Sequence, residues 1–346
     1  MALTDLDEYL IHQTGDTMDQ PEGGDPNFVD RLYIGCHSLD GQVHLAIGLG
    51  VYPNKNIMDG YVLVREGGQQ HNLLLSRHLD QDRAKTEVGP LSIKVLEPHR
   101  RWAVNVADNV SAIHCAVEFT ARAAPFLCPK LTIPGVVSQG HYFQMGRFSG
   151  ELRVAGRVFD AGKFVGVRDR SWGVRGGKKG GAKGFFHLWI HAHFATFTLS
   201  ILHVEMGEGV VVLSDAVISH DDGRVVPIVQ ILHRIAFAPG ARTPSNMELC
   251  LHDAAGVQHL LSAQVISPGM YLNGGGYDRC GEDRGPLAVT ADTWDVSQPF
   301  GIESERFGNV EPIARFSLDG HDGVGILESS WDRAEDYAYR STLTAK

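Results

Sequence analysis

The sequence predicts an all-β protein built from two β-units. Apolar residues recur with period two: in Ala112–Arg122, every second residue from Ile113 to Phe119 is apolar. The 346 residues include 40 glycines, many of them in Asp-Gly pairs that favour tight hairpin turns. Helical periodicity is weak outside Leu3–His12. Many short strands with regular turns indicate barrels or sandwiches, and this length of strand exceeds one small barrel.

The expected strands are short, rich in β-branched or aliphatic residues, and bounded by glycine, proline or aspartate. In chain order they are Val43–Gly50, Tyr61–Glu66, Ala112–Arg122, Gln139–Gly150, Phe185–Glu205, Val210–Ser219, Val225–Phe237, Met247–Leu251, Gln258–Ile266, Ile313–Leu318 and Gly323–Ser329. We expect Glu151–Asp160 to form a hairpin and Trp331–Lys346 a closing strand with a tail. The Asp-Gly pairs at 40–41, 59–60, 222–223, 319–320 and 322–323 are expected to mark turns.

The division between the two units is expected near residues 160–184. Residues 173–184 read GVRGGKKGGAKG, with six glycines, three lysines and one arginine in twelve positions. Glycine supplies neither packing surface nor conformational restraint, so this stretch is predicted to be a flexible loop. We therefore expect an N-terminal β-barrel over residues 1–165 and a C-terminal β-barrel over residues 166–346.

The charge and the cysteine pattern argue against several classes of partner. With 31 Lys+Arg against 41 Asp+Glu the formal charge is −10, which disfavours binding to nucleic acid or an anionic membrane. The five cysteines form no CxxC pair, so neither a disulfide framework nor a zinc ribbon is predicted. The acidic start does not resemble a signal peptide, and no long apolar run predicts an integral membrane segment. These features favour a cytoplasmic protein, and a homodimer is compatible with them.

Several common catalytic motifs do not occur in the sequence. Neither Gly162-Lys163 nor Gly177-Lys178 completes a Walker A loop, and Asn273–Gly276 does not complete GxGxxG. The nucleophile elbow GxSxG and the zinc motif HExxH are absent. The sequence therefore disfavours a P-loop enzyme and an elbow-type serine hydrolase, and it predicts no cofactor.

A row of aromatic rings is predicted on one face of a single strand. His187, Trp189, His191 and His193 share this face, and the residues between them are apolar. Three interpretations stay open: a hydrogen-bonded or solvent-facing histidine row, a row that lines a ligand cavity, and a metal site. No partner ligand is identifiable nearby, so no metal is predicted.

The densest chemical segment is Gly166–Arg175, with the sequence GVRDRSWGVR. In an extended strand Asp169 faces away from Arg168 and Arg170, so its carboxylate can enter a cavity while the arginines form ion pairs elsewhere. The alternative is a structural turn, in which Asp169 accepts backbone hydrogen bonds and Trp172 packs between the two units.

This segment resembles the G-x-R-D-H/R-S-W-G-x-R signature of the AttH-like and carotenoid 1,2-hydratase-like proteins. Weaker similarity covers His44–Asn54, the following Asp59-Gly60, and Gly323–Glu328, so the similar pieces span most of the chain. The resemblance implies two lipocalin-like antiparallel β-barrels packed together. It also implies action on apolar small molecules, by hydration of an isoprenoid double bond or by cyclisation or isomerisation. The glycine- and lysine-rich insertion departs from the family pattern, so a carotenoid substrate is not implied.

Acid–base chemistry on a carbon–carbon double bond requires a positioned acid, a stabilised cation and a placed water. A carboxylic acid in apolar surroundings has a raised pKa, which makes Asp169 the leading candidate for the acid. His191 or His193 is the candidate base for the attacking water, and Glu328 is a second acid or base. An arginine folded back onto Asp169 would weaken acid catalysis.

The other candidates are expected to bind the ligand, and aromatic faces would stabilise a developing cation by about 0.5–2 kcal/mol each. These residues are Tyr142, Trp172, Arg175, His187, Trp189 and Trp331. We expect a hydratase (hydro-lyase), isomerase or cyclase that acts on an isoprenoid-like or polyketide-like molecule. The alternatives are a non-catalytic intracellular carrier of a lipophilic ligand and, third, a metal-dependent enzyme on the histidine row. The leading hypothesis requires Asp169 and the 187–193 row to face one apolar chamber.

Overall fold

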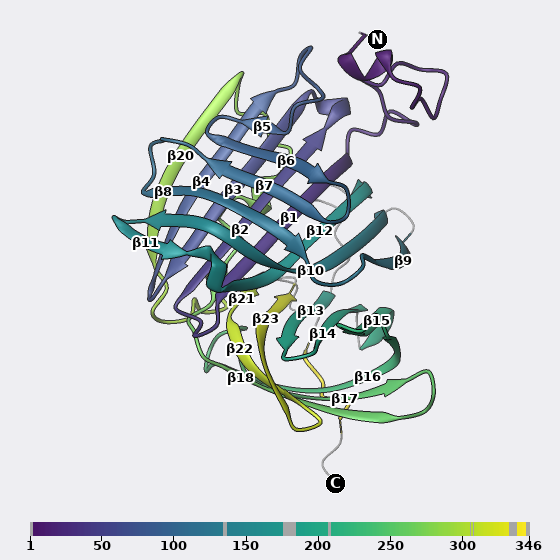
Figure 1. Ribbon diagram of the computed structural model, residues 1–346, viewed down its shortest axis with the longest axis vertical. Helices are drawn as coiled ribbons and strands as arrows, with labels where there is room; N and C mark the ends of the chain where they lie inside the picture. Colours follow the sequence, from purple (N-terminus) through teal and green to yellow (C-terminus); the bar gives the residue numbers. More distant parts are fainter. Residues whose placement is uncertain are drawn as a thin grey trace.

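Figure 1 shows two β-sheets, one above the other, in a computed structural model of the chain. The structure describes residues 3–133, 137–175, 185–206, 209–304, 306, 308–331 and 338–343, with only the backbone at 133, 185 and 331. Within these residues every regular element is an antiparallel strand or a short 3-10 turn. The turns are η1 (Asp5–Glu8), η2 (Pro53–Lys55), η3 (Ala161–Lys163) and η4 (Tyr277–Arg279). The predicted fold class, two packed antiparallel β-barrels, is confirmed.

The first sheet winds into an incompletely closed barrel, in which the limb β5–β8 crosses over β1–β4 (Figure 1). Its order is β20-β4-β3-β2-β1-β12-β10-β8-β7-β6-β5, and β9 and β11 pair with β10. Its described strands are β1 (Phe28–Ser38), β2 (Val43–Tyr52), β3 (Ile57–Glu66), β4 (Gln69–His78), β5 (Glu87–Val88), β6 (Leu91–Glu97), β7 (Arg101–Val106), β8 (Ile113–Ala121), β9 (Phe126–Ile133), β10 (Val137–Val154), β11 (Arg157–Asp160), β12 (Phe164–Arg175) and β20 (Leu287–Asp295).

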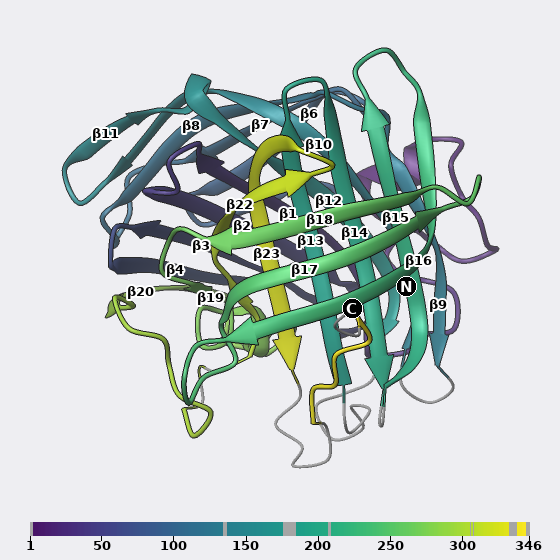
Figure 2. The same ribbon diagram turned by 90° about the horizontal axis from the view of Figure 1, so that it is seen from below.

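The second sheet closes into a barrel because β13 pairs with both β14 and β23. The closed order is β13-β14-β15-β16-β17-β18-β22-β23, with β21 and β19 continuing beyond β23. Figure 2 shows this barrel from below, with β16, β17 and β18 crossing β13 and β14. Its described strands are β13 (Phe185–Phe194), β14 (Phe197–Met206), β15 (Val210–His220), β16 (Val225–Phe237), β17 (Pro244–Asp253), β18 (Gln258–Val265), β19 (Met270–Tyr271), β21 (Val310–Glu311), β22 (Ile313–Leu318) and β23 (His321–Trp331).

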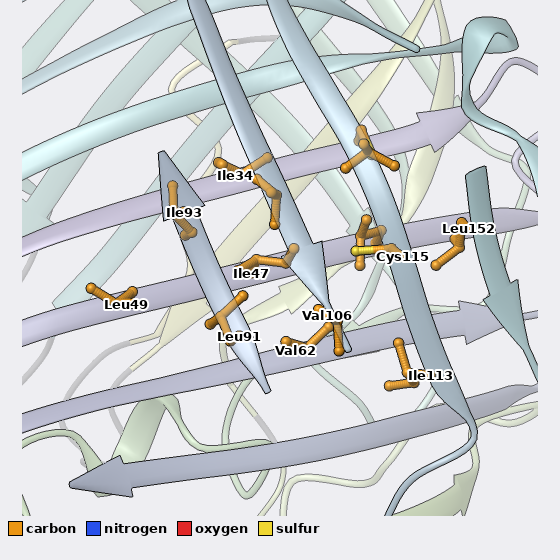
Figure 3. Close-up of a cluster of buried hydrophobic side chains, with 14 of the residues drawn as sticks. Ile34, Ile47, Leu49, Val62, Leu91, Ile93, Val106, Ile113, Cys115 and Leu152 are labelled. Atoms are coloured by element: carbon orange, nitrogen blue, oxygen red, sulfur yellow. The ribbon is translucent and has the colours of Figure 1, made fainter. Parts of the chain in front are cut away.

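Each barrel has its own apolar core. Figure 3 shows Ile34 of β1 and Ile47 of β2 in one cluster with Leu91 of β6 and Val106 of β7, which belong to the limb that crosses over them. In the second barrel the inward face of β13, represented by Leu188, belongs to the core, as the alternation predicts. Each fully buried aliphatic side chain contributes about 1.5–3 kcal/mol.

The two barrels meet along a third buried cluster, which we call the seam. Strands β1–β4, β9, β10 and β12 of the first sheet contribute one side, and β13–β15, β19, β22 and β23 of the second contribute the other. Its buried apolar members are Tyr33, Ala46, Tyr61, Leu63, Leu74, Cys128, Phe143, Met145, Val167, Trp189, Leu202, Val204, Val217, Met270, Leu272, Ile313 and Ile326. A Cβ at Gly48 would overlap the Tyr61 ring, so this glycine leaves room for the tyrosine to lie flat between the sheets.

The predicted strands differ from the structure in two places that have a physical reason. The single strand expected at Phe185–Glu205 is two strands, β13 and β14, because the chain bends at residues 195 and 196 without a glycine or proline. Asp59-Gly60 and Asp322-Gly323 lie inside β3 and β23 rather than in turns. A side chain at position 323 would meet the ring of Phe194 on the paired strand, so this glycine serves close packing.

The two sheets do not divide the chain at one point. Strand β12 belongs to the first sheet, and β20 from the C-terminal half pairs with β4 of that same sheet. The predicted division into two domains, between residues 165 and 166, stays a prediction. Residues 176–184 of the predicted flexible loop lie outside the described residues. In the described part of the chain, no helix has the length and apolar character needed to span a bilayer.

Candidate active site

Asp169 lies on the seam face of β12 and contacts His141 of β10. Strand register places Asp169 opposite Tyr33 on one side and Phe143 on the other. His141 Nε2 and Asp169 Oδ2 are 3.0 Å apart, and each side chain is 15% exposed. A partly exposed carboxyl–imidazole pair of this geometry can accept or relay a proton.

The arginines beside Asp169 in sequence are held away from it. Arg168 points into the first barrel, where its Nη2 donates to Gln144 Oε1 at 2.6 Å. Arg170 pairs with Asp30 at 2.6 Å. This is the opposite facing that a period of two predicts, and it leaves the Asp169 carboxyl directed to the seam.

A second acidic group lies in the seam, where Glu311 of β21 meets Glu328 of β23. The two carboxyls are hydrogen-bonded, and Tyr33 donates its hydroxyl to Glu311 Oε2 at 2.8 Å. Burial raises the pKa of Glu311 well above its ordinary value, and the adjacent Glu328 and Asp169 raise it further. Two carboxyls in contact cannot both ionise cheaply, so Glu311 keeps its proton to a higher pH than a free glutamate does.

The outer part of the 187–193 row reaches this carboxyl pair. His187 Nδ1 is 3.4 Å from Glu328 Oε1, and the His187 side chain is 19% exposed. The Trp189 ring meets the Tyr33 ring edge-on, with centroids 5.4 Å apart. Glu328, His187 and Trp189 therefore lie together on the second-barrel side of the seam.

The inner part of the row is fully buried. His191 Nδ1 is 3.0 Å from Ser200 Oγ, and His193 Nε2 is 2.9 Å from its acceptor, the Gly166 carbonyl oxygen. Burial lowers the pKa of His191 well below its ordinary value and lowers the pKa of His193 to about 3. Both rings are therefore neutral at physiological pH, and His191 lies in face-to-edge contact with Phe143, at 4.9 Å between centroids.

Asp169 and the histidine row thus face the same layer, which also contains buried aromatic side chains. Phe143, Trp189 and Tyr33 are all buried there. A chamber shared by Asp169 and the row stays a prediction. Asp169, His141 and His187 are the partly exposed members of this layer, so solvent reaches the seam at these side chains.

The remaining predicted residues divide between the two faces of β10 and β12. Arg175 donates to Ser171 Oγ at 2.9 Å and to Gln139 Oε1 at 3.0 Å, near the Asp169 end of the seam. Tyr142 and Trp172 lie on the opposite face, toward the first barrel, with ring centroids 6.2 Å apart. The side chain of Trp331 lies outside the described residues.

Trp172 lines a cavity of about 1120 Å³ at the mouth of the first barrel. Its lining includes the apolar residues Leu32 and Leu49, and Leu6 and Met18 of the N-terminal segment. Strand β12 therefore separates this cavity from Asp169.

Sequence reasoning did not find Glu311, Tyr33 or His141. Glu311 lies in a strand of two residues, too short for periodicity to mark it, and its carboxyl partner arrives through tertiary pairing. His141 and Tyr33 fall on regular strands, where an alternating pattern signals a face but not a function.

The fold defines a class: all-β proteins built from two packed barrels. A family model described as a family of unknown function (DUF8625) matches residues 3–331, and the chain belongs to that family. A comparison with curated proteins finds no match.

Solved structures show the same fold at low sequence identity. A protein assigned as AttH from Nitrosomonas europaea has a TM-score of 0.59 at 12% identity, covering 88% of this chain and 92% of that one. CghA has a TM-score of 0.55 at 11% identity, covering 88% of each chain. CghA with Sch210972 has a TM-score of 0.53 at 11% identity, covering 88% and 89%. The AttH-like resemblance seen in Gly166–Arg175 is therefore confirmed at the level of the fold.

Proposed function

We propose that this protein carries out an acid–base transformation of a hydrophobic small molecule at the seam. The reaction is a hydration or dehydration, an isomerisation or a cyclisation at a carbon–carbon double bond of an isoprenoid-like or polyketide-like substrate. The observation that carries the proposal is the buried Glu311–Glu328 carboxyl pair beside the Asp169–His141 dyad. A protonated carboxyl and a partly exposed carboxyl–imidazole pair supply an acid and a base in one apolar layer.

In a hydration, the carboxyl pair donates a proton to one alkene carbon, and positive charge develops on the other. The rings of Trp189 and Tyr33 lie beside the pair and would stabilise this charge by about 0.5–2 kcal/mol each. Water then adds to the cation, and the Asp169–His141 dyad accepts the proton that the water loses. Isomerisation or cyclisation begins with the same protonation and ends when the dyad removes a proton from carbon.

His191 and His193 remain candidate bases, and Glu328 keeps its proposed role as acid or base. Burial favours the neutral form of both imidazoles. We assign the principal base to Asp169–His141 instead, because these side chains are partly exposed to an entering substrate.

The test starts with mass spectrometry of small molecules that co-purify from the native host. These molecules, and a panel of isoprenoid and polyketide alkenes, are then incubated with the protein in H₂¹⁸O or D₂O. Hydration places ¹⁸O in the product, whereas isomerisation or cyclisation by protonation places deuterium on carbon. We expect Asp169→Asn and Glu311→Gln to fold and to lose the label. Glu118→Gln, on the first barrel's surface beside Arg101, should keep it.

The first-barrel cavity favours a second candidate, a carrier of a lipophilic ligand. Its volume exceeds that of most ligand pockets, and many of its lining residues are apolar. A carrier would bind an apolar fluorescent probe there and consume nothing. Leu49→Trp, which places a larger side chain in the cavity lining, would then abolish probe binding, whereas Asp169→Asn would leave it unchanged. Bound ligand without any isotope incorporation would replace the enzyme proposal with this one.

A further inference from the structure

A cluster of three potential metal ligands lies inside the second barrel, away from the seam. His203 and Glu205 belong to β14, and His233 belongs to β16. All three side chains are at most 1% exposed, and their nearest ligand atoms lie within 4.8 Å of one another. On β14, residues that alternate with His203 and Glu205 face the seam instead, so the strand separates the two sites.

The contacts within the cluster converge on one carboxylate oxygen. Glu205 Oε1 is 2.9 Å from His203 Nε2 and 2.7 Å from His233 Nε2. The other ring nitrogens are also held: His203 Nδ1 is 3.2 Å from Ser214 Oγ, and His233 Nδ1 is 3.0 Å from Tyr339 Oη. Outer hydrogen bonds on Nδ1 fix the ring orientation and direct Nε2 to a common point, as they do around protein-bound metal ions.

We propose that His203, Glu205 and His233 bind a divalent first-row transition-metal ion of the Zn²⁺ class. Two imidazoles and a carboxylate suit Zn²⁺, Fe²⁺ or Co²⁺. Metal–ligand bonds of about 2.1 Å place neighbouring ligands about 3.0 Å apart in an octahedron and about 3.4 Å apart in a tetrahedron. The two histidine–glutamate separations are already close to these values, so small rotations of the side chains admit the ion.

Metal binding reverses the direction of the two outer hydrogen bonds: the Ser214 and Tyr339 hydroxyls donate to Nδ1 without metal and accept from Nδ1–H with it. Without metal, each Nε2–H donates to Glu205 Oε1. With metal, each neutral ring carries its proton on Nδ1 and donates it to Ser214 Oγ or to Tyr339 Oη. The protein already places an oxygen at each Nδ1, which is the arrangement that the metal-bound tautomer requires.

The site also connects to the C-terminal segment 338–343. The Tyr339 hydroxyl accepts the backbone N–H of Ile235, and Thr342 exchanges hydrogen bonds with the backbone of His233. A metal ion bound at His233 would strengthen the ring's bond to Tyr339. It would thereby hold this segment against β16, so the site is stabilising and lies apart from the proposed reaction.

The test uses the full-length protein, treated with a chelator and then titrated with Zn²⁺ and with Co²⁺. We expect one equivalent by calorimetry and elemental analysis, a visible Co²⁺ absorption band, and a rise in melting temperature with Zn²⁺. Glu205→Gln should weaken affinity at least 100-fold. Tyr339→Phe keeps the ring but removes the outer hydrogen bond, so it should weaken affinity about 10–100-fold.

The matched control is His187→Gln, which removes a histidine from the seam and should leave metal affinity unchanged. Binding of less than 0.1 equivalent by the wild-type protein would overturn the proposal. So would unchanged affinity in Glu205→Gln, or an equal loss in His187→Gln. If Glu205→Gln does not fold, the wild-type stoichiometry and the Tyr339→Phe affinity decide the question.

Discussion

The protonated state of Glu311 can be tested by the substitution Glu311→Gln. Glutamine has the shape of a protonated glutamate: its amide oxygen can accept the Tyr33 hydroxyl, and its amide N–H can donate to Glu328. If Glu311 holds a proton in the folded protein, the substitution changes few contacts. The free energy of unfolding should then differ from that of the wild type by less than about 1 kcal/mol near pH 4.

The magnitude above pH 4 follows from proton linkage. An unfolded glutamate ionises near pH 4.3, whereas burial and the adjacent Glu328 keep the folded Glu311 protonated to a higher pH. Between these two pKa values the folded wild type binds one more proton than the unfolded chain, so its stability falls as pH rises. The fall is about 1.4 kcal/mol per pH unit, and it ends at the pKa of the folded protein. Glu311→Gln lacks this loss and becomes relatively more stable as pH rises.

The assay is urea unfolding of both proteins at pH 5, 6, 7 and 8. The difference between the two free energies of unfolding should grow by about 1.4 kcal/mol per unit over the lower part of this range. Glu118→Gln is the control: hydrogen bonding to Arg101 lowers the pKa of Glu118, so its difference should not grow in this direction. Parallel curves for wild type and Glu311→Gln would show that Glu311 is ionised in the fold, and the proposed acid would be wrong.

Three further predictions concern β12 and its neighbours. Burial lowers the pKa of His193 to about 3, so its contribution to the free energy of unfolding is complete above pH 6.5 and is lost as pH falls toward 3. In urea unfolding, His193→Gln should reduce the slope of the free energy of unfolding against pH by about 1.4 kcal/mol per unit between pH 6 and 4. An unchanged slope would contradict the assignment. Arg168→Met leaves Gln144 Oε1 without its donor and should cost about 2–4 kcal/mol by the same assay, whereas a neutral result would mean that the buried guanidinium is dispensable. Gly166→Ala would drive a Cβ into the Gly35 carbonyl and should lower the melting temperature by several degrees, with wild-type stability as the contradicting outcome.

The fold class was predictable because alternation and turn residues report local structure. The apolar face of Leu188 and the facing of Asp169 both follow from the period of two, and both agree with the structure. Closure of the second barrel was not predictable, because it depends on pairing between β13 and β23, far apart in sequence. The turn predicted at Asp59-Gly60 was wrong for a related reason: Gly60 lies inside a strand and leaves room for close packing against residues of other strands.

The candidate site was predictable only where its residues lie on long strands. Asp169, His187 and Glu328 come from β12, β13 and β23, where the sequence marks a face. The carboxyl pair needs Glu311, and the two-residue strand that carries it gives no pattern. Trp172 lies on the other face of β12 from Asp169, where it lines the first-barrel cavity, because residues three apart on a strand face opposite sides. Chemical grouping is a property of tertiary pairing, which residue types alone do not specify.

The polarity of the seam costs stability, and this supports a use other than joining the barrels. Among the described residues, buried atoms without a hydrogen-bond partner from the protein include His191 Nε2 and the Tyr61 hydroxyl. Each such group costs about 1–3 kcal/mol, which apolar residues of the same shape would avoid. Tyr61→Phe should therefore raise the free energy of unfolding by about 1 kcal/mol in urea.

The matched control for Tyr61→Phe is Tyr271→Phe. The Tyr271 hydroxyl is 3.0 Å from Thr243 Oγ1 and accepts the backbone N–H of Phe300 at 3.0 Å, so its removal should destabilise the protein. Opposite signs for the two substitutions would show that the seam holds polar groups at the expense of stability. If Tyr61→Phe destabilises the protein as much as Tyr271→Phe does, the Tyr61 hydroxyl is hydrogen-bonded in the fold. The seam's polar groups would then stabilise the contact between the barrels, and their cost could not be used to argue for a function.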